Sequence, residues 1–522
     1  MAIALLLVLA AMFALAFIVL PRREEQKRFD SSGAERIRGT IKIAGDTYLG
    51  YWFVNSSEFK RQLLNRGYTV SWTQDNGNYP ERHKKFADGS YDMIVLPIST
   101  YLLHGKQYEY PGVITFILSE SRGADMIVGY KNRVVNQEER EPTVNDLNNA
   151  GLKTCFTPDS PSSFLLQTAI VHFALDELSQ KGAWTVETSG SGDAYNRLRK
   201  GECDVAVLWE PDVSKALEIP GVVPIFGSDQ IAGMIVDVFV VKRSQFDDPQ
   251  KIEAFFSAYN ETLGLYGGKN QQMLEEMKRG SAFSSEESLK KALDRIAWFD
   301  LRDNCHDWYG IGTQDLQQAL RERVVDAMNQ IVDVSLEIGD VAQDPLAGNP
   351  FSIINFSLLE ELCKGQVVEG ADIGASVQLD VPFDSLTSEQ WAKLRVVGKM
   401  KIAPITFEPG TDQLTVEGQK VLNQVATSLT FNYPQYRILV KGHTSLAFNP
   451  EGEQANAMLS QERAEVVRNY LETIHGIHEN RLLALGIGGS DPPVRKRGEG
   501  DLSYRNRLPR VEFILLEDAR KE

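Results

Sequence analysis

From about residue 38 onward, short apolar segments alternate with stretches of helical periodicity. Strands are predicted at 40–44, 68–72 and 91–96, and again after Ser121 at 125–129, 152–156, 185–187, 204–208 and 236–241. Helices are predicted at 59–66 and 249–265. Repeated β-α-β units specify parallel sheets covered by helices. We therefore predict an α/β fold of two lobes for residues 38–390, with the second lobe at about 122–232. No pattern assigns residues 310–390, which we group with the same domain.

The length and charge of the chain limit its organisation and its partners. At 522 residues it is too long for one hydrophobic core, so two or three domains are expected. The formal net charge of −16 repels phosphate backbones, and no basic stretch interleaved with aromatic residues reverses this. Nucleic acid is therefore not an expected partner.

The N-terminal residues 2–20 form an apolar run. As a helix this run of about 19 residues would span roughly 28 Å, the thickness of a bilayer core. A cleaved signal peptide is the alternative, but no basic residue precedes the run, and its Ala14-x-Ala16 pattern lies inside the apolar segment. We predict an uncleaved transmembrane anchor at 1–20 and a linker at 21–37. Four basic residues between 22 and 28 conflict with a periplasmic location under the positive-inside rule.

Residues 199–211, with the sequence Arg-Lys-Gly-Glu-Cys-Asp-Val-Ala-Val-Leu-Trp-Glu-Pro, carry a resemblance to a known family. They are similar to a motif of the type 2 periplasmic solute-binding proteins, in particular the nitrate, sulfonate and taurine group. Residues 238–242 and 255–259 support the likeness. The resemblance implies a periplasmic location, two lobes around a cleft, and a small anionic solute as ligand.

Ligands of parallel sheets bind beyond the carboxyl ends of the strands, which indicates where the contacts should lie. The turn at 157–163 places hydroxyl and N–H groups at a helix N-terminus, where an anion is favoured. The turns at 46–50 and 99–101 could close on the same ligand, with an arginine at the lobe crossing as counter-charge. The predicted ligand contacts are Thr47, Tyr48, Ser99, Thr100, Arg122, Ser160, Ser162, Ser163, Trp209 and Glu210. The alternative is that the serines only cap the helix and that Trp209 only packs the lobe.

The last part of the chain, residues 391–518, predicts a compact βαβαββ domain. Strands are expected at 400–407, 436–443, 482–487 and 510–516, with helices at 416–429 and 461–473. The segment contains four motifs, Phe-Glu-Pro-Gly-Thr-Asp-Gln-Leu at 407–414, Lys-Gly-His-Thr at 441–444, the helical motif at 456–464, and Asn-Arg at 506–507. Together they resemble the OmpA C-terminal domain, a peptidoglycan-binding module.

This second resemblance implies contact with the diaminopimelate of the peptidoglycan stem peptide. Arg463 would fork onto a carboxylate of that zwitterion, and Asn456 would support the turn. The aspartate that would take the ammonium is replaced by Ser445. Either Glu451 or Glu453 of the following insertion substitutes for it, or the contact with the wall is weakened or lost. The predicted wall-binding residues are Thr444, Ser445, Asn456, Arg463 and Arg507.

No pattern indicates an enzyme, a cofactor or a metal site. The seven histidines form no HExxH pair, and the four cysteines form no CxxC pair. Cys155 and Cys203 could form a disulfide or remain buried free thiols. Two functions stay open: a solute-binding protein of the inner membrane, serving a transporter or another inner-membrane protein, and a scaffold subunit of an envelope-bridging or stator-like assembly.

Overall fold

The computed structural model describes residues 36–518 apart from 136–139, 232, 268–269, 281–282, 284, 312–322, 365–382, 448 and 496–498. The predicted membrane anchor at 1–20 and most of the predicted linker at 21–37 lie outside the described residues. Among the helices that are described, none has both the length and the apolar character needed to cross a membrane.

Lobe 1 is built on a six-stranded sheet with the order β11-β4-β10-β3-β1-β2. The strands are β1 (Gly39–Gly45), β2 (Tyr68–Gln74), β3 (Met93–Pro97), β4 (Gly112–Ser121), β10 (Val236–Lys242) and β11 (Ile296–Trp298). Strand β1 runs parallel to β2 and β3, whereas β10 is antiparallel to β3 and β4. Every residue of β3 and β4 is buried, as expected for strands covered on both faces. The helices of this lobe include α4 (Ser57–Asn65), α5 (Tyr79–Ala87), α6 (Ile98–Gly105) and α11 (Pro249–Leu265).

Lobe 2 is built on a five-stranded sheet with the order β7-β6-β8-β5-β9. The strands are β5 (Asp125–Tyr130), β6 (Thr154–Phe156), β7 (Thr185–Glu187), β8 (Val205–Trp209) and β9 (Val222–Gly227). Successive side chains alternate between the faces. Met126 and Val128 join the hydrophobic cluster under α9 (Ser191–Arg199) and α10 (Asp212–Leu217), whereas Ile127 joins the main core, which also contains α8 (Pro161–His172).

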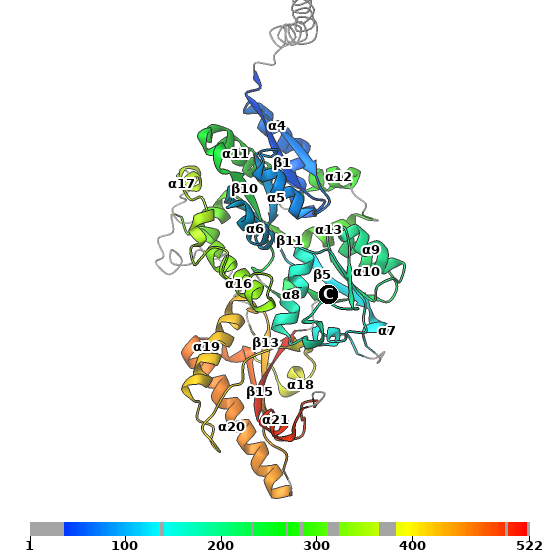
Figure 1. The fold of residues 1–522 in the computed structure, drawn as a ribbon, viewed down its shortest axis with the longest axis vertical. Helices are drawn as coiled ribbons and strands as arrows, with labels where there is room; N and C mark the ends of the chain where they lie inside the picture. Colours follow the sequence, from blue (N-terminus) through cyan, green and yellow to red (C-terminus); the bar gives the residue numbers. More distant parts are fainter. Residues whose placement is uncertain are drawn as a thin grey trace, which may run out of the picture.

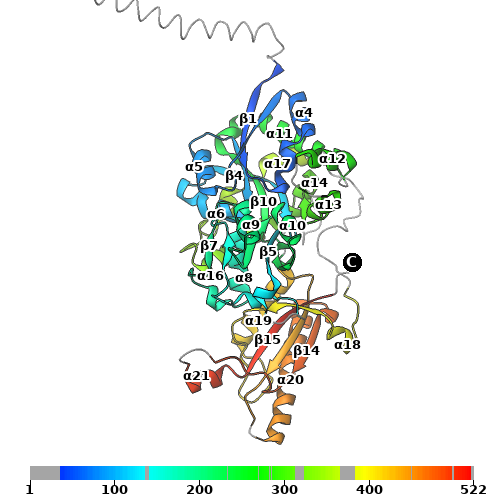
Figure 2. The same ribbon diagram turned by 90° about the vertical axis from the view of Figure 1, so that its right-hand side faces the viewer.

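The chain crosses between the lobes twice, from β4 to β5 and from β9 back to β10. These crossings and the two separate sheets confirm the predicted two-lobed α/β fold. Figures 1 and 2 show lobe 1, lobe 2 and the C-terminal domain following one another along the long axis of the molecule.

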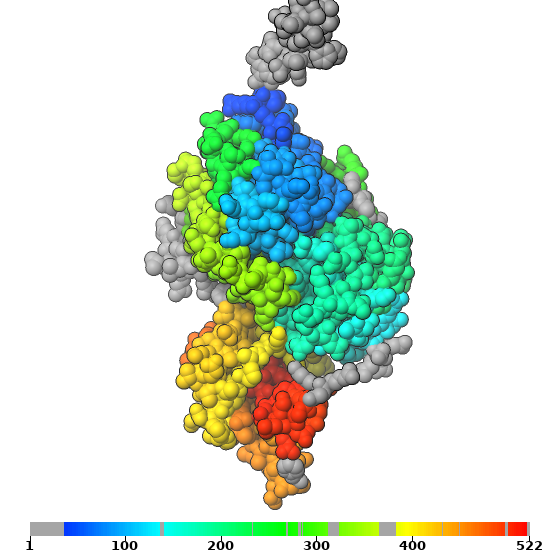
Figure 3. All heavy atoms as spheres, in the orientation of Figure 1, coloured from blue at the N-terminus to red at the C-terminus, as the bar shows by residue number. Residues whose placement is uncertain are grey.

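The segment after β11 contains α14 (Leu301–Asp303), a π-helical turn (Asn304–Trp308), α16 (Arg323–Ile338) and α17 (Ser357–Cys363). Helix α16 contacts both α6 of lobe 1 and α8 of lobe 2. In the space-filling view it lies beside both lobes, above the C-terminal domain (Figure 3). All four cysteines are paired, as Cys155–Cys203 and Cys305–Cys363, so the question that the sequence left open is answered in favour of disulfides.

The C-terminal domain has a four-stranded sheet with the order β12-β15-β13-β14. The strands are β12 (Arg395–Lys399), β13 (Arg437–His443), β14 (Leu482–Gly486) and β15 (Arg510–Glu517), and the two long helices are α19 (Val416–Phe431) and α20 (Pro450–His475). The short helices are α18 (Ser388–Trp391) and α21 (Asp501–Asn506). The order of the main elements confirms the predicted βαβαββ pattern.

Two boundaries in this domain differ from the prediction. The strand expected at 400–407 is wrong, because the pairing with β15 is made by Arg395–Lys399 instead. Beyond Met400 the backbone turns to lobe 2, where the Lys401 N–H donates to the carbonyl of His172 at 2.6 Å. Helix α20 begins at Pro450 rather than at residue 461, so the insertion after Ser445 forms its first turns.

Candidate ligand cleft and wall-binding surface

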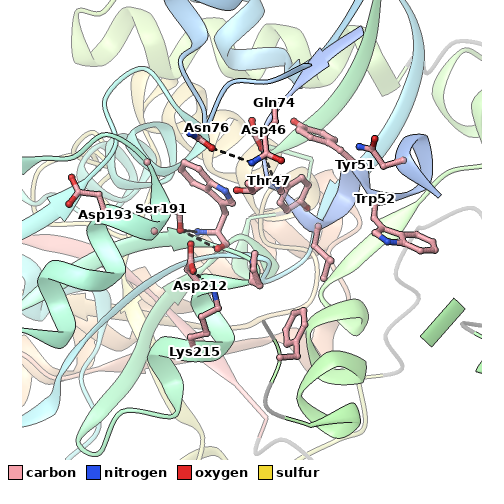
Figure 4. Close-up of a pocket in the computed structure, with 18 of the residues that line it drawn as sticks. Asp46, Thr47, Tyr51, Trp52, Gln74, Asn76, Ser191, Asp193, Asp212 and Lys215 are labelled. Carbon is pink, nitrogen blue, oxygen red and sulfur yellow. Dashed lines mark hydrogen bonds and ion pairs between the residues drawn. The ribbon is translucent and has the colours of Figure 1, made fainter. Parts of the chain in front are cut away.

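A cavity of about 760 Å³ lies between the two lobes. Its lobe 1 wall comes from residues 46–55 and 72–76, and its lobe 2 wall from residues 189–193 and 209–215. Figure 4 shows Asp46, Thr47, Gln74 and Asn76 on one side and Ser191, Asp193, Asp212 and Lys215 on the other. This volume lies in the range of small-molecule binding sites.

The topology explains why these residues meet. Parallel strands bring their carboxyl ends to one edge of a sheet, and β1 and β2 end where residues 46 and 76 begin the cleft wall. In lobe 2, β7 and β8 end just before Ser189 and Pro211. The two edges face each other, and a Cβ on Gly190 would lie only 3.1 Å from the carbonyl of Asn76. Because Gly190 has a φ of +151°, a side chain there would be strained as well as crowded.

Asp46 is held by a buried ion-pair network on the lobe 1 side. The guanidinium of Arg82, fully buried, lies 2.9 Å from Asp46 and 2.5 Å from Asp75. Arg82 also donates to the carbonyl of Val95, and Tyr79 donates its hydroxyl to Asp46 at 3.1 Å. One guanidinium therefore serves two carboxylates, which keeps this wall of the cleft acidic.

On the lobe 2 side, carboxylates occupy the first turns of both helices that reach the cleft. Asp193 accepts the Ser189 N–H at 3.1 Å at the start of α9 and pairs with Arg197 at 3.2 Å. Asp212 opens α10 and pairs with Lys215 at 2.8 Å. These side chains occupy positions where a helix dipole would otherwise favour an external anion.

Aromatic side chains form a further part of the wall. Tyr48 and Tyr51 pack edge to face with ring centroids 5.2 Å apart, and Trp72 lies 6.4 Å from Tyr51. Trp209 reaches from lobe 2 toward lobe 1, where its indole ring lies 3.5 Å from the position of a Cβ on Gly77. Its indole N–H is buried and has no hydrogen-bond partner among the described residues.

Two more carboxyl groups are buried near the cleft. Burial raises the pKa of Asp125 to about 7, and the carboxylates of Asp46 and Glu210 add to the effect. Burial also raises the pKa of Asp237 well above its usual range, although the Tyr51 hydroxyl donates to it. These groups resist ionisation as long as no cation lies near them.

Of the ten predicted ligand contacts, Thr47, Tyr48 and Trp209 line the cavity. The remaining seven lie outside its wall. Ser160 and Ser163 bond to each other's backbone and side chain as a capping box, and Ser162 donates its hydroxyl to the carbonyl of Val207 at 3.0 Å. The turn that the sequence assigned to an anion thus uses its hydroxyls inside the protein, as the capping alternative expects.

The other predicted contacts are also engaged internally. The Thr100 hydroxyl donates to the carbonyl of Pro97, and its neighbour Ser99 is buried beside it in α6. Arg122 pairs with buried Glu120 at 3.0 Å instead of facing the cavity. Glu210 is fully buried and receives Arg295 at 2.6 Å. None of these residues lines the cavity, so their roles in ligand binding remain predictions.

The predicted wall-binding surface centres on Arg463, on α20. Its Nε donates to the carbonyl of Thr411 at 2.9 Å, and its guanidinium stacks on the ring of Phe407 at 4.9 Å. Its two terminal nitrogens make no hydrogen bond to the described residues, which leaves them available for a carboxylate. Partial burial lowers the pKa of Arg463, and the neighbouring Asp412 opposes this shift.

The other predicted wall contacts are arranged around the turn after β13. Asn456 donates its side-chain amide to the carbonyl of exposed Ser445 at 2.8 Å, as expected of a residue that supports the turn. Thr444 is buried, and its N–H donates to Gly488. Arg507 is paired with Glu499 at 2.7 Å.

The acids proposed to replace the missing aspartate lie far from Arg463. Glu451 and Glu453 are in the first turn of α20, which places them roughly 15–18 Å from Arg463 along the helix axis. Asp412 is instead the acid that acts on Arg463 electrostatically. Asp412 belongs to the 407–414 motif, so the motif pointed to this part of the chain, but the sequence did not predict that Asp412 lies near Arg463.

A cluster of His443, Asp491 and Glu512 has potential metal-ligand atoms within 4.8 Å of one another. Each carboxylate already has a cation, however: Lys441 lies 2.7 Å from Asp491, while Lys399 and Arg510 pair with Glu512 at 3.2 and 2.8 Å. Both carboxylates of this cluster are therefore paired with protein cations.

Comparisons with known proteins address the two parts of the chain separately. Residues 406–507 match the model of the OmpA family. The alkanesulfonate-binding protein SsuA from Xanthomonas axonopodis pv. citri is similar in structure, with 13% identity, a TM-score of 0.46, and coverage of 60% of this chain and 98% of that chain. The periplasmic aliphatic sulphonate-binding protein SsuA from Escherichia coli shows 16% identity, a TM-score of 0.44, and coverage of 61% and 92%.

The periplasmic nitrate-binding protein NrtA from Synechocystis PCC 6803 is 11% identical, with a TM-score of 0.45 and coverage of 63% of this chain and 89% of that chain. The comparison with curated proteins found no match. Residues 406–507 of the C-terminal domain thus match the OmpA family, and this domain follows a two-lobed α/β domain whose chain crosses twice between its two sheets.

Proposed function

We propose that this chain is a cell-envelope receptor that closes its two lobes around a small solute while its C-terminal domain binds peptidoglycan. The observation that carries the proposal is the cavity of about 760 Å³ between lobes that are joined to an OmpA-family domain. A protein that only senses or delivers a solute needs the cleft alone. The second domain adds a fixed position at the wall.

The proposal extends to the location and the ligands of the chain. Residues 1–20 would anchor it in the inner membrane as a single span, with the remainder in the periplasm and a transporter or another inner-membrane protein as partner. The diaminopimelate of the stem peptide would be the ligand of Arg463. An anionic solute is what the sequence predicts, and sulfonates and nitrate are named for similar structures. A test of the cleft must therefore include anions.

The scaffold function is the competing proposal, in which the two-lobed fold only docks other proteins. The formed cavity, lined by residues of both lobes, favours the receptor. A cleft that binds no solute of any charge would favour the scaffold.

The wall-binding part is tested by co-sedimentation of the purified full-length protein with sacculi. We expect Arg463→Ala to weaken binding roughly tenfold to a hundredfold, because a charge-assisted bidentate contact contributes about 1.5–3 kcal/mol. Arg468→Ala is the matched control, since Arg468 lies on the same helix and pairs only with Glu472 in the described contacts. Equal retention of both variants on sacculi would show that Arg463 has no part in wall binding.

A further inference from the structure

The charge of the cleft wall is negative. Among the described residues, its lining contains Asp46, whose carboxylate is buried, Asp193, Asp212 and the cation Lys215, and Asp193 pairs with Arg197 outside the lining. Lys215 is already paired with Asp212 at 2.8 Å, and Arg82 behind the wall is shared between Asp46 and Asp75. No arginine lines the cavity in the described part of the chain, so an anion would meet more like charge than opposite charge there.

The N-terminus of α9 in the cleft agrees with this charge. Helix α9 reaches the cavity with its N-terminus, where an external anion could bind backbone N–H groups. Asp193 of this first turn already accepts the Ser189 N–H and hydroxyl and has its own arginine. The protein thus supplies the negative charge at this position itself.

The aromatic side chains of the cavity wall can make cation–π contacts with a bound cation. Tyr48, Tyr51, Trp52, Trp72 and Trp209 all line the cavity. Aromatic faces attract ammonium groups through their negative quadrupole, and they do so more strongly in a site with little water. The indole N–H of Trp209, 2% exposed and without a described partner, is a donor for one oxygen atom of the ligand.

We propose that the cleft binds a small organic ammonium ion that carries an oxygen acceptor, with the ammonium held between the carboxylates and the aromatic rings. This inference rests on the proposed receptor function and names the class of its solute. The carboxyl groups of Asp125 and Asp237, whose pKa values are raised by burial and further by neighbouring carboxylates, support it, because a cation in the cleft would offset both effects.

The test compares three probes of similar size on the full-length protein: choline, its uncharged isostere 3,3-dimethyl-1-butanol, and the anion isethionate. Ethanolamine and putrescine extend the set of ammonium ions. Binding is followed by the fluorescence of the cleft tryptophans and by the melting temperature. We expect saturable binding of at least one ammonium ion and, for choline, binding at least tenfold tighter than that of the isostere.

Two variants of the charge pair in the wall give opposite expectations. Asp212→Asn leaves Lys215 unpaired and should weaken binding of the ammonium ion roughly tenfold, whereas Lys215→Met frees Asp212 and should strengthen it several-fold. A folding defect cannot account for stronger binding. Asp247→Asn, an exposed site outside the cleft, is the matched control and should leave affinity unchanged.

The outcomes separate the inference from the function on which it rests. Saturable binding of isethionate, with no ammonium ion bound, would overturn the inference and retain the receptor. Equal affinity for choline and its isostere would also overturn the inference, because the cleft would then recognise shape without charge. A folded protein that binds none of the probes would overturn the receptor function and the inference together.

Discussion

Asp125 is a residue whose environment works against its charge. It is the first residue of β5, pairs in register with Trp209 of β8, and is almost fully buried. One carboxyl oxygen has no described hydrogen-bond partner, and burial together with the carboxylates of Asp46 and Glu210 raises its pKa to about 7. An acidic side chain retained at such a site costs stability whenever it ionises, which fits a residue placed near a cleft for cations.

Replacing this carboxyl group gives a prediction with a defined pH window. An unfolded aspartate has a pKa of about 3.9, so the folded state binds the proton more tightly and the stability contributed by Asp125 falls as the pH rises from about 4 to about 7. The asparagine of Asp125→Asn cannot ionise. At pH 8 the variant should therefore have a free energy of unfolding higher by roughly 1–3 kcal/mol, and a higher melting temperature, with little effect at pH 4. Thermal denaturation at both pH values checks this. The same change in stability at pH 4 and pH 8 would contradict it, and Asp247→Asn serves as the exposed control.

The elements themselves could mostly be predicted from the sequence, because strand and helix periods are local signals. The helix expected at 249–265 is α11, and most of the strands expected in both lobes form within a few residues of their predicted ends. The strand at 400–407 failed because a contact with lobe 2 redirects the backbone, which no local pattern shows. Lining residues such as Asp193 and Lys215 were missed for a related reason: their role depends on two lobes facing each other. The only local signal was their position just after strands β7 and β8.

The disulfide Cys155–Cys203 connects β6 to the turn before β8 within lobe 2. It closes a loop with a sequence separation of 48, for which loop-closure entropy predicts a stabilisation of about 4 kcal/mol. Both cysteines are buried, so replacing them with alanine removes the cross-link without adding a polar group to the core. We expect the double variant to unfold at a lower urea concentration than the unaltered protein under oxidising conditions. Reduction of this disulfide should lower the urea midpoint of the unaltered protein and cannot do so in the variant. Unchanged unfolding under oxidising conditions would show that the cross-link contributes no stability.

At the scale of the whole molecule, the C-terminal domain is attached to lobe 2 and to α16. Lys399 N donates to Asn145 at 2.6 Å, Gln435 donates to the carbonyl of Asp229 at 2.8 Å, and Asn432 donates to Gln330 of α16 at 2.8 Å. The hydrogen bonds described between this domain and the two-lobed part reach lobe 2, the crossing segment after β9 and α16, and Asn480 also donates to the carbonyl of Phe383 in the segment that leads into the domain. A domain bound to the wall would therefore hold lobe 2, and opening of the cleft would move lobe 1 relative to the wall.

Tyr433 is the central residue of this contact. It is fully buried, its hydroxyl lies 2.6 Å from Nδ1 of His172, and its ring packs against Phe173 at 6.0 Å. Burial lowers the pKa of His172 to about 4, so the imidazole is neutral at pH 7 and suits a hydrogen bond with a phenol. Removal of a buried aromatic ring costs about 3–5 kcal/mol, and here the loss falls on the contact between the domains.

We therefore expect Tyr433→Ala to uncouple the unfolding of the two parts. Calorimetry of the full-length protein should show two transitions where the unaltered chain shows one, and proteolysis should become faster in the segment between residues 383 and 399. Tyr470→Ala is the matched control, because Tyr470 belongs to the same domain but bonds to Asn423 within it. If Tyr433→Ala only lowers a single transition, as Tyr470→Ala would, the contact does not join the domains into one cooperative unit. The C-terminal domain would then be only a tether for the two lobes, and movement of the lobes could not be transmitted through it.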